Sequence, residues 1–88
     1  MLPNTIHPGE FLQDMLKDRK IPQALLARHI GVEPGVINLI CKGKRGISAV
    51  MAKKLGRALG TDVELWANLQ TSYDLTLADD PGFQKLRA

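Results

Sequence analysis

The stretch from Gln23 to Gly43, QALLARHIGVEPGVINLICKG, constrains the fold of this chain more than any other segment. Ala24, Ala27 and Ile30 recur at the spacing of one face of a helix. Gly31 follows them at a position where a helix often ends with a residue of positive φ. The segment is therefore predicted to begin with a short helix that stops at a sharp turn.

A second short helix is predicted after this turn. Pro34 suits its first turn, where a missing N–H is tolerated, and Gly43 marks its end. Its apolar face consists of Val36, Ile37 and Ile40. Ala27 supplies the small side chain that two helices need where they cross at a steep angle. This pattern is typical of a DNA-binding helix-turn-helix, whose second helix enters the major groove.

Three more helices are predicted around this pair, over about residues 8–19, 48–59 and 62–73. Pro8 lies in the first turn of the first of them, and Ser48 caps the second. Thr61 or Asp62 is the expected cap of the third. Apolar residues recur on one face of each helix, so we expect an all-α fold of five helices packed around one core.

Length and composition indicate one small domain. The 88 residues, 44% of them hydrophobic, supply material for a single core. We expect a helical domain over residues 1–75 and a C-terminal tail over residues 76–88, in which Asp80-Pro81 is a candidate start for a short helix. A domain of this size is only marginally stable alone, so a homodimer is expected.

Cysteine content and hydropathy favour a cytoplasmic protein. The lone Cys41 excludes an internal disulfide framework, and we expect it to fill a core position. No apolar run approaches the ~20 residues of a membrane span, and residues 1–10 lack a signal pattern. His7 and His29 lie far apart without the neighbours of a ligand cluster, so neither a metal nor another cofactor is expected. The chain also lacks a phosphate loop and a nucleophile paired with a base, so we do not expect an enzyme.

The net charge of +3 conceals an asymmetry along the chain. Residues 1–60 carry ten Lys or Arg against four acidic residues, whereas residues 61–88 carry two against five. A basic front and an acidic rear suit a protein that binds a polyanion at one end and another partner elsewhere. A solvated surface of mixed charge is the alternative.

Beyond the helix-turn-helix, two strings resemble a known family. They are HPGEFL near the start and GKRGISAVMAKKLGRALGTDVELWANLQTSYDL, and the similarity covers roughly residues 6 to 75. They resemble the HigA-type antitoxins, which are lambda-repressor-like (XRE) helix-turn-helix proteins. The resemblance implies a five-helix domain that dimerises and binds a palindromic operator at its own promoter. It also implies neutralisation of a RelE/HigB-like toxin that cleaves mRNA.

The candidate DNA-binding residues lie on the helix-turn-helix and just after it. They are Gln23, Glu33, Gly35, Val36, Asn38, Leu39, Lys42, Lys44 and Arg45. The three cations lie where members of the family contact the phosphate backbone, and each neutralised phosphate would release counterions. The alternative is a solvated basic loop.

Base reading is predicted chiefly from Asn38, whose amide can pair with adenine N6 and N7. Gln23 can bond phosphate or support a base contact. Val36 and Leu39 are candidates for contact with thymine methyl groups, and Glu33 is a candidate for contact with a cytosine amino group. The alternatives are a core position for Val36, a water-bonded surface amide for Asn38, and a protein contact for Leu39 together with Leu25.

Two features depart from the family pattern. The family usually opens helix 2 with Ser-Gln-x-Glu, a capping box, where this chain has Pro22, Gln23 and Leu25. The reading helix is usually rich in Ser, Thr and Arg, whereas here it begins Glu33-Pro34-Gly35-Val36, and bidentate contact to guanine requires Arg or Lys. Two alternative functions therefore stay open. One is a protein-binding antitoxin module with little DNA binding, and the other is a stand-alone XRE-family regulator.

Apolar residues near the C-terminus form the candidate interface with a second copy or a toxin. Trp66, Leu69 and Tyr73 recur at i, i+3 and i+7, and Trp66 is expected in the core. The candidate interface residues are Leu69, Tyr73 and Phe83, because aromatic side chains anchor such contacts. The acidic segment 61–88 is expected to face a toxin that is itself basic.

Overall fold

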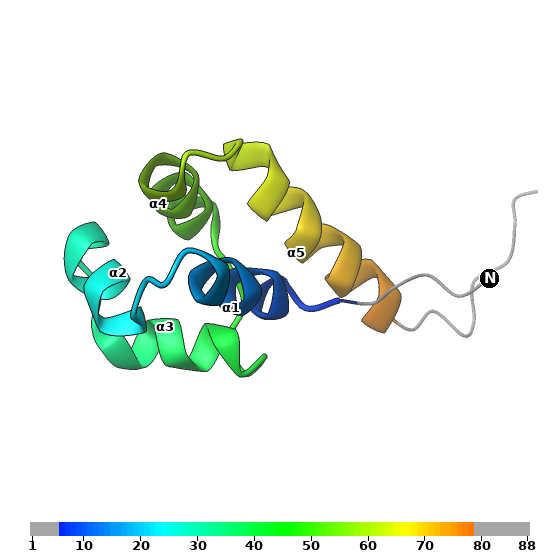
Figure 1. The fold of residues 1–88 in the computed structure, drawn as a ribbon. Helices are drawn as coiled ribbons and strands as arrows, with labels where there is room; N and C mark the ends of the chain where they lie inside the picture. The colour runs from blue at the N-terminus through cyan, green and yellow to red at the C-terminus, as the bar shows by residue number, and fades with distance from the viewer. Residues whose placement is uncertain (1–5, 79–88) are drawn as a thin grey trace, which may run out of the picture.

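Five helices make up most of residues 6–78, which are the residues described by this computed structural model (Figure 1). They are α1 (Pro8–Asp18), α2 (Gln23–Ile30), α3 (Pro34–Cys41), α4 (Ala49–Leu59) and α5 (Val63–Leu77). The described residues contain no strand. The prediction of an all-α fold with a helix-turn-helix formed by its second and third helices is confirmed.

Most helix ends follow the predicted local signals. His7 Nδ1 accepts a hydrogen bond from Gly9 N at 2.8 Å, and Ser48 Oγ accepts one from Met51 N at 3.1 Å. Gly31 and Gly60 end α2 and α4 with φ of 76° and 71°, a conformation that costs glycine little. These residues fix the lengths of α1, α2 and α4.

The helix α5 begins where predicted, but its capping and its end differ from the prediction. Asp62 occupies the N-cap position without a side-chain cap bond, and Thr61 Oγ1 instead accepts a hydrogen bond from Trp66 Nε1 at 2.7 Å. The helix continues past Tyr73 to Leu77. Its last turn is closed by a backbone bond from Ala78 N to Asp74 O at 2.9 Å, although Leu75 and Leu77 are exposed. The candidate helix at Asp80-Pro81 lies outside the described residues.

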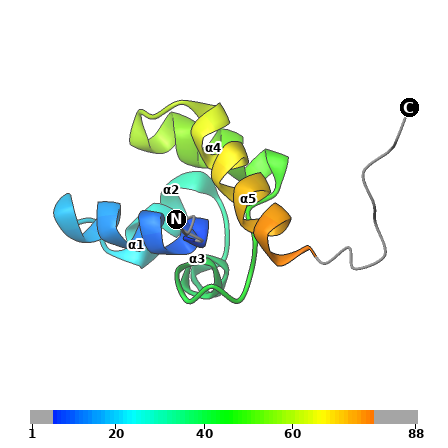
Figure 2. The same cartoon turned by 90° about the vertical axis from the view of Figure 1, so that its right-hand side faces the viewer.

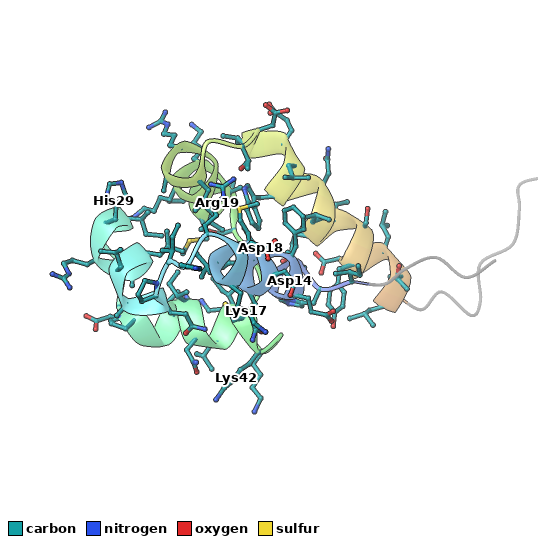
Figure 3. The ribbon with its side chains drawn as sticks, in the orientation of Figure 1. Asp14, Lys17, Asp18, Arg19, His29 and Lys42 are labelled. Carbon is teal, nitrogen blue, oxygen red and sulfur yellow. The ribbon has the colours of Figure 1, made fainter. Side chains whose placement is uncertain are left out.

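Two cationic side chains satisfy carbonyl groups at the ends of neighbouring helices. Lys54 Nζ donates to Ile30 O, the last residue of α2, at 2.9 Å. Arg19 Nη1 donates to Leu59 O, the last residue of α4, at 2.7 Å, and its side chain extends toward α4 in Figure 3. A cation at a helix C-terminus is favoured by both the hydrogen bond and the helix dipole. The two bonds therefore tie α4 to α2 and the end of α1 to α4.

A single apolar cluster fills the space between the helices. Its most deeply buried large side chains are Leu12, Ile37, Ile40, Leu55 and Trp66. Phe11 packs edge-on against Trp66 with ring centroids 5.3 Å apart, which joins α1 to α5. Figure 2 shows α1, α2 and α3 on one side of this core and α4 and α5 on the other.

Cys41 and Ala27 occupy the core positions predicted for them. Ala27 is fully buried where α2 packs on its neighbours, and Cys41 is 6% exposed. Burial raises the pKa of the Cys41 thiol by removing the thiolate from water. Among residues 6–78, no helix has the length and apolar character needed to cross a membrane.

Two of the glycines that lie inside helices provide a test of this packing. A Cβ on Gly9 would overlap the backbone carbonyl of Ile40, so we expect Gly9→Ala to lower the free energy of unfolding by about 1–3 kcal/mol. A Cβ on Gly35 would meet no atom within 4 Å, so Gly35→Ala should raise it by about 0.4–1 kcal/mol. Urea denaturation followed by circular dichroism measures both. Equal stability of Gly9→Ala and the unchanged protein would contradict the close approach of α1 to α3.

Candidate nucleic-acid interface

The outward face of α3 is a narrow stripe of mixed chemistry. Gly35, Asn38, Leu39 and Lys42 recur at i, i+3, i+4 and i+7, opposite the buried Ile37, Ile40 and Cys41. Leu39 is 40% exposed, Lys42 is exposed, and Asn38 is half-buried. In order along the helix, the stripe offers an open backbone, an amide, an isobutyl group and a cation.

The two amides predicted to read or support bases are hydrogen-bonded to each other. Asn38 Nδ2 donates to Gln23 Oε1 at 3.3 Å, across the junction of α2 and α3. The bond engages one N–H of Asn38, whose amide has a second N–H and an oxygen. Bidentate pairing with adenine needs one N–H and one oxygen. The contact therefore orients Asn38 and leaves it the groups that adenine recognition needs.

Other predicted residues at the start of α3 differ in exposure. Val36 is half-buried and packs against the core, so the alternative that it belongs to the core is the one the packing favours. Glu33 is exposed at the N-cap position of α3, without a side-chain cap bond, and α2 likewise begins at Pro22 without one. No other side chain replaces the missing capping box at the start of α2, and α3 begins without a side-chain cap as well.

The basic loop directly follows α3. Lys42, Lys44 and Arg45 are all exposed. The loop starts from a tight turn in which Gly43 N donates to Ile40 O at 3.0 Å and Lys44 N donates to Leu39 O at 2.9 Å. Figure 3 shows the side chain of Lys42 at the foot of α3, pointing away from the other helices. The cations and the outward stripe of α3 therefore form one continuous surface.

Sequence reasoning did not assign a site role to Gln70, although this residue touches the far end of the loop. Its Oε1 accepts a hydrogen bond from Ile47 N at 2.7 Å, and Ile47 itself is 6% exposed. The spacing of Gln70 indicates an inward position, because the residue lies one turn after the buried Trp66 on the same face of α5. A polar residue on an inward face needs a hydrogen-bond partner.

The candidate interface residues of α5 are partly buried against the rest of the protein. Leu69 is half-buried against the core, and the half-buried Tyr73 packs edge-on against the His7 ring, with centroids 4.7 Å apart. Phe83 lies outside the described residues. Leu25, which is 50% exposed, lines a groove between α2 and the end of α4, whereas Leu39 belongs to the stripe on α3. His29 is exposed on α2.

A family model and proteins of known structure match this chain. The helix-turn-helix family model (HTH_3) matches residues 12–66. The Pseudomonas aeruginosa antitoxin HigA, solved with higBA promoter DNA, is 44% identical, with a TM-score of 0.80 over 83% of this chain and 80% of that chain. An addiction module antidote protein of the HigA family from Coxiella burnetii is 34% identical, with a TM-score of 0.77 over 85% of this chain and 83% of its own.

A curated relative agrees with these matches. Virulence-associated protein I of Dichelobacter nodosus is 43% identical over 75 residues, which are 84% of this chain and 69% of that protein. The family model covers more than half of the chain and includes α2 and α3 completely. The chain therefore belongs to the helix-turn-helix family and, within it, to the HigA antitoxins.

Proposed function

We propose that this protein is a HigA-like antitoxin, a sequence-specific DNA-binding autorepressor that also binds and neutralises a RelE/HigB-like mRNA-cleaving toxin. The observation that carries the DNA-binding part is the continuous surface of the α3 stripe and the exposed cations that follow it. The similar HigA of Pseudomonas aeruginosa was solved with promoter DNA, which supports DNA binding by this chain as well. The protein would act in the cytoplasm by binding, without a cofactor or catalysis.

On DNA, α3 would enter the major groove and the basic loop would contact phosphates. Lys42, Lys44 and Arg45 would set the position of the protein, because phosphate contacts strengthen binding without reading sequence. In a homodimer, two copies of α3 would lie about 34–36 Å apart, one turn of DNA, and would match a palindromic operator. Gln23 would fix the register through its bond to Asn38.

The stripe on α3 suits A·T base pairs better than G·C pairs. Asn38 offers the donor and acceptor that adenine N7 and N6 require, and Leu39 offers an apolar surface for a thymine methyl group. Before Lys42, the stripe carries no guanidinium or ammonium group that would read guanine. We therefore expect the operator half-site to place adenine and thymine against the middle of α3.

The toxin would bind elsewhere on the protein. Leu69 and Tyr73 on α5, together with Phe83, are the proposed contacts with a second copy or with the toxin. The acidic balance of residues 61–88 would favour a basic toxin. The short stripe on α3 favours one rival function, a protein-binding antitoxin with little DNA binding. A comparison of binding to promoter DNA and to a scrambled duplex distinguishes this function from the proposed one.

Binding to promoter DNA should be specific and steeply salt-dependent. We expect fluorescence anisotropy to show about 10³-fold tighter binding to the protein's own upstream DNA than to a scrambled duplex. The Lys44→Ala/Arg45→Ala variant should lower the magnitude of the salt slope by roughly 1 to 2 per protomer, because two cations no longer neutralise phosphates. Lys53→Ala on α4 is the matched control and should leave the slope unchanged. Equal, weak binding to both duplexes would favour the protein-binding module.

Replacing thymine by uracil isolates the proposed methyl contact. We expect uracil throughout the half-site to weaken binding about fourfold per half-site, because the contact with one methyl group is lost and burial of a group of that size contributes about 0.8 kcal/mol. The Leu39→Ser variant should bind the thymine duplex and the uracil duplex with equal affinity, because serine offers no apolar surface to the thymine methyl group. Asn38→Ala should instead cost about 1–3 kcal/mol and relax the preference for adenine. A Leu39→Ser variant that discriminates thymine from uracil as the unchanged protein does would contradict this assignment.

The acidic segment should contribute to toxin binding. We expect Asp79→Asn/Asp80→Asn to weaken capture of the co-expressed toxin several-fold at low salt, with a smaller effect at high salt, because the attraction is electrostatic and screened. Asp74 stays unchanged because its carboxylate accepts a hydrogen bond from Gln70. Promoter affinity serves as the control for folding. Toxin capture that is equal in both proteins at every salt concentration would argue against the acidic contact.

A further inference from the structure

Both ends of the Gln70 side-chain amide are occupied. Its Oε1 accepts a hydrogen bond from Ile47 N at 2.7 Å, and its Nε2 donates to Asp74 Oδ1 at 2.9 Å. A carboxylate accepts and a backbone N–H donates, so the two partners together define one orientation of the amide. Gln70 thus presents a fixed acceptor to the segment between α3 and α4.

The loop passes directly against this amide. A Cβ added to Gly46 would come within 3.0 Å of Gln70 Oε1 and 3.1 Å of its Cδ, so a side chain at position 46 would displace the Gln70 amide from its present position. The next residue, Ile47, places its side chain in the core cluster. The end of the loop is therefore held by one hydrogen bond and one buried apolar group. Figure 2 shows this connection passing beside α5.

Two fixed points bound the part of the loop that carries Lys44 and Arg45. The first is the turn that closes α3, where Lys44 N donates to Leu39 O at 2.9 Å. The second is Ile47, three residues later, held by Gln70. Arg45 and Gly46 are the residues between these points, so fixing Ile47 limits the paths that the loop can take. An ordered loop loses less conformational entropy when it binds phosphates.

We propose that Gln70 is a positioning residue for DNA binding, which acts from α5 by holding the loop of residues 42–47 in the shape that presents its cations to phosphates. The proposal rests on the proposed function and deepens it, because it names a residue outside the helix-turn-helix that acts on the phosphate contacts. Gln70 lies between Leu69 and Tyr73, the proposed partner contacts on α5. The same helix thus carries the anchor of the basic loop and the proposed interface.

The test uses Gln70→Met, which keeps most of the side-chain volume and removes both hydrogen bonds. Salt titrations by fluorescence anisotropy against the promoter duplex should show affinity weakened by about 3- to 10-fold and a shallower salt slope, by roughly 1 for each phosphate that the loop no longer neutralises. Asn68→Ala, exposed on the same helix, is the matched control and should match the unchanged protein. Gly46→Ala approaches the contact from the loop side and should reproduce the effect of Gln70→Met.

A double-mutant cycle separates positioning from general destabilisation. In the Lys44→Ala/Arg45→Ala background, Gln70→Met should have little further effect on DNA affinity, because the two cations nearest the anchored end of the loop are gone. The proposal is overturned if Gln70→Met leaves the affinity and the salt slope unchanged. It is also overturned if affinity falls by the same factor with and without the two cations, since the residue would then act only through overall stability.

Amide hydrogen exchange of the free protein gives a readout that does not depend on DNA. Gln70→Met should speed exchange at Ile47 N–H about tenfold or more, while amides of the core residues Leu55 and Trp66 keep their protection. Unchanged exchange at Ile47 would overturn the anchor. If the unchanged protein binds no promoter DNA, the proposed function fails and the positioning role with it, whereas the exchange result still decides whether Gln70 orders the loop.

Discussion

The position of α3 against α1 and α2 is the constraint on which the rest of the structure depends. Ile37 and Ile40 are fully buried, and the N-terminus of α1 approaches so closely that Gly9 has no room for a Cβ beside the Ile40 carbonyl. Ala27 is fully buried and presents only a methyl group where α2 packs on its neighbours. Because its neighbours fix the inward face of α3, its outward stripe is fixed as well.

The other helices then act as supports rather than as recognition elements. Arg19 and Lys54 each donate to the last carbonyl of a neighbouring helix, which ties α4 to both α1 and α2. Trp66 anchors α5 through full burial and through its hydrogen bond to Thr61. Gln70 extends this support to the basic loop. The chain thus uses cations and amides at helix ends for rigidity, and it leaves Lys42, Lys44 and Arg45 exposed.

The sequence predicts those features that depend on local signals. Ser48, Gly31 and Gly60 give the helix boundaries because capping and positive φ are properties of single positions, and helical spacing gives the composition of the α3 stripe. The last turn of α5 could not be predicted, because its leucines are exposed and have no inward pattern. The bonds of Asn38 to Gln23 and of Ile47 to Gln70 join residues 15 and 23 positions apart, so they depend on how the helices cross.

The chemistry of the α3 stripe explains why positioning carries so much of the proposed function. A bidentate base contact discriminates by only about 1–3 kcal/mol, and this stripe offers one amide and one apolar group before its cation. Phosphate contacts add affinity but no sequence information. With so few base contacts, the proposed discrimination would depend on placing Asn38 and Leu39 against the same bases every time. The Gln23 bond to Asn38 orients the amide, and the Gln70 bond holds the end of the loop whose cations we propose as phosphate contacts. Selectivity in this protein would therefore come from rigid placement of a short reading surface, repeated by the two-fold symmetry of a dimer.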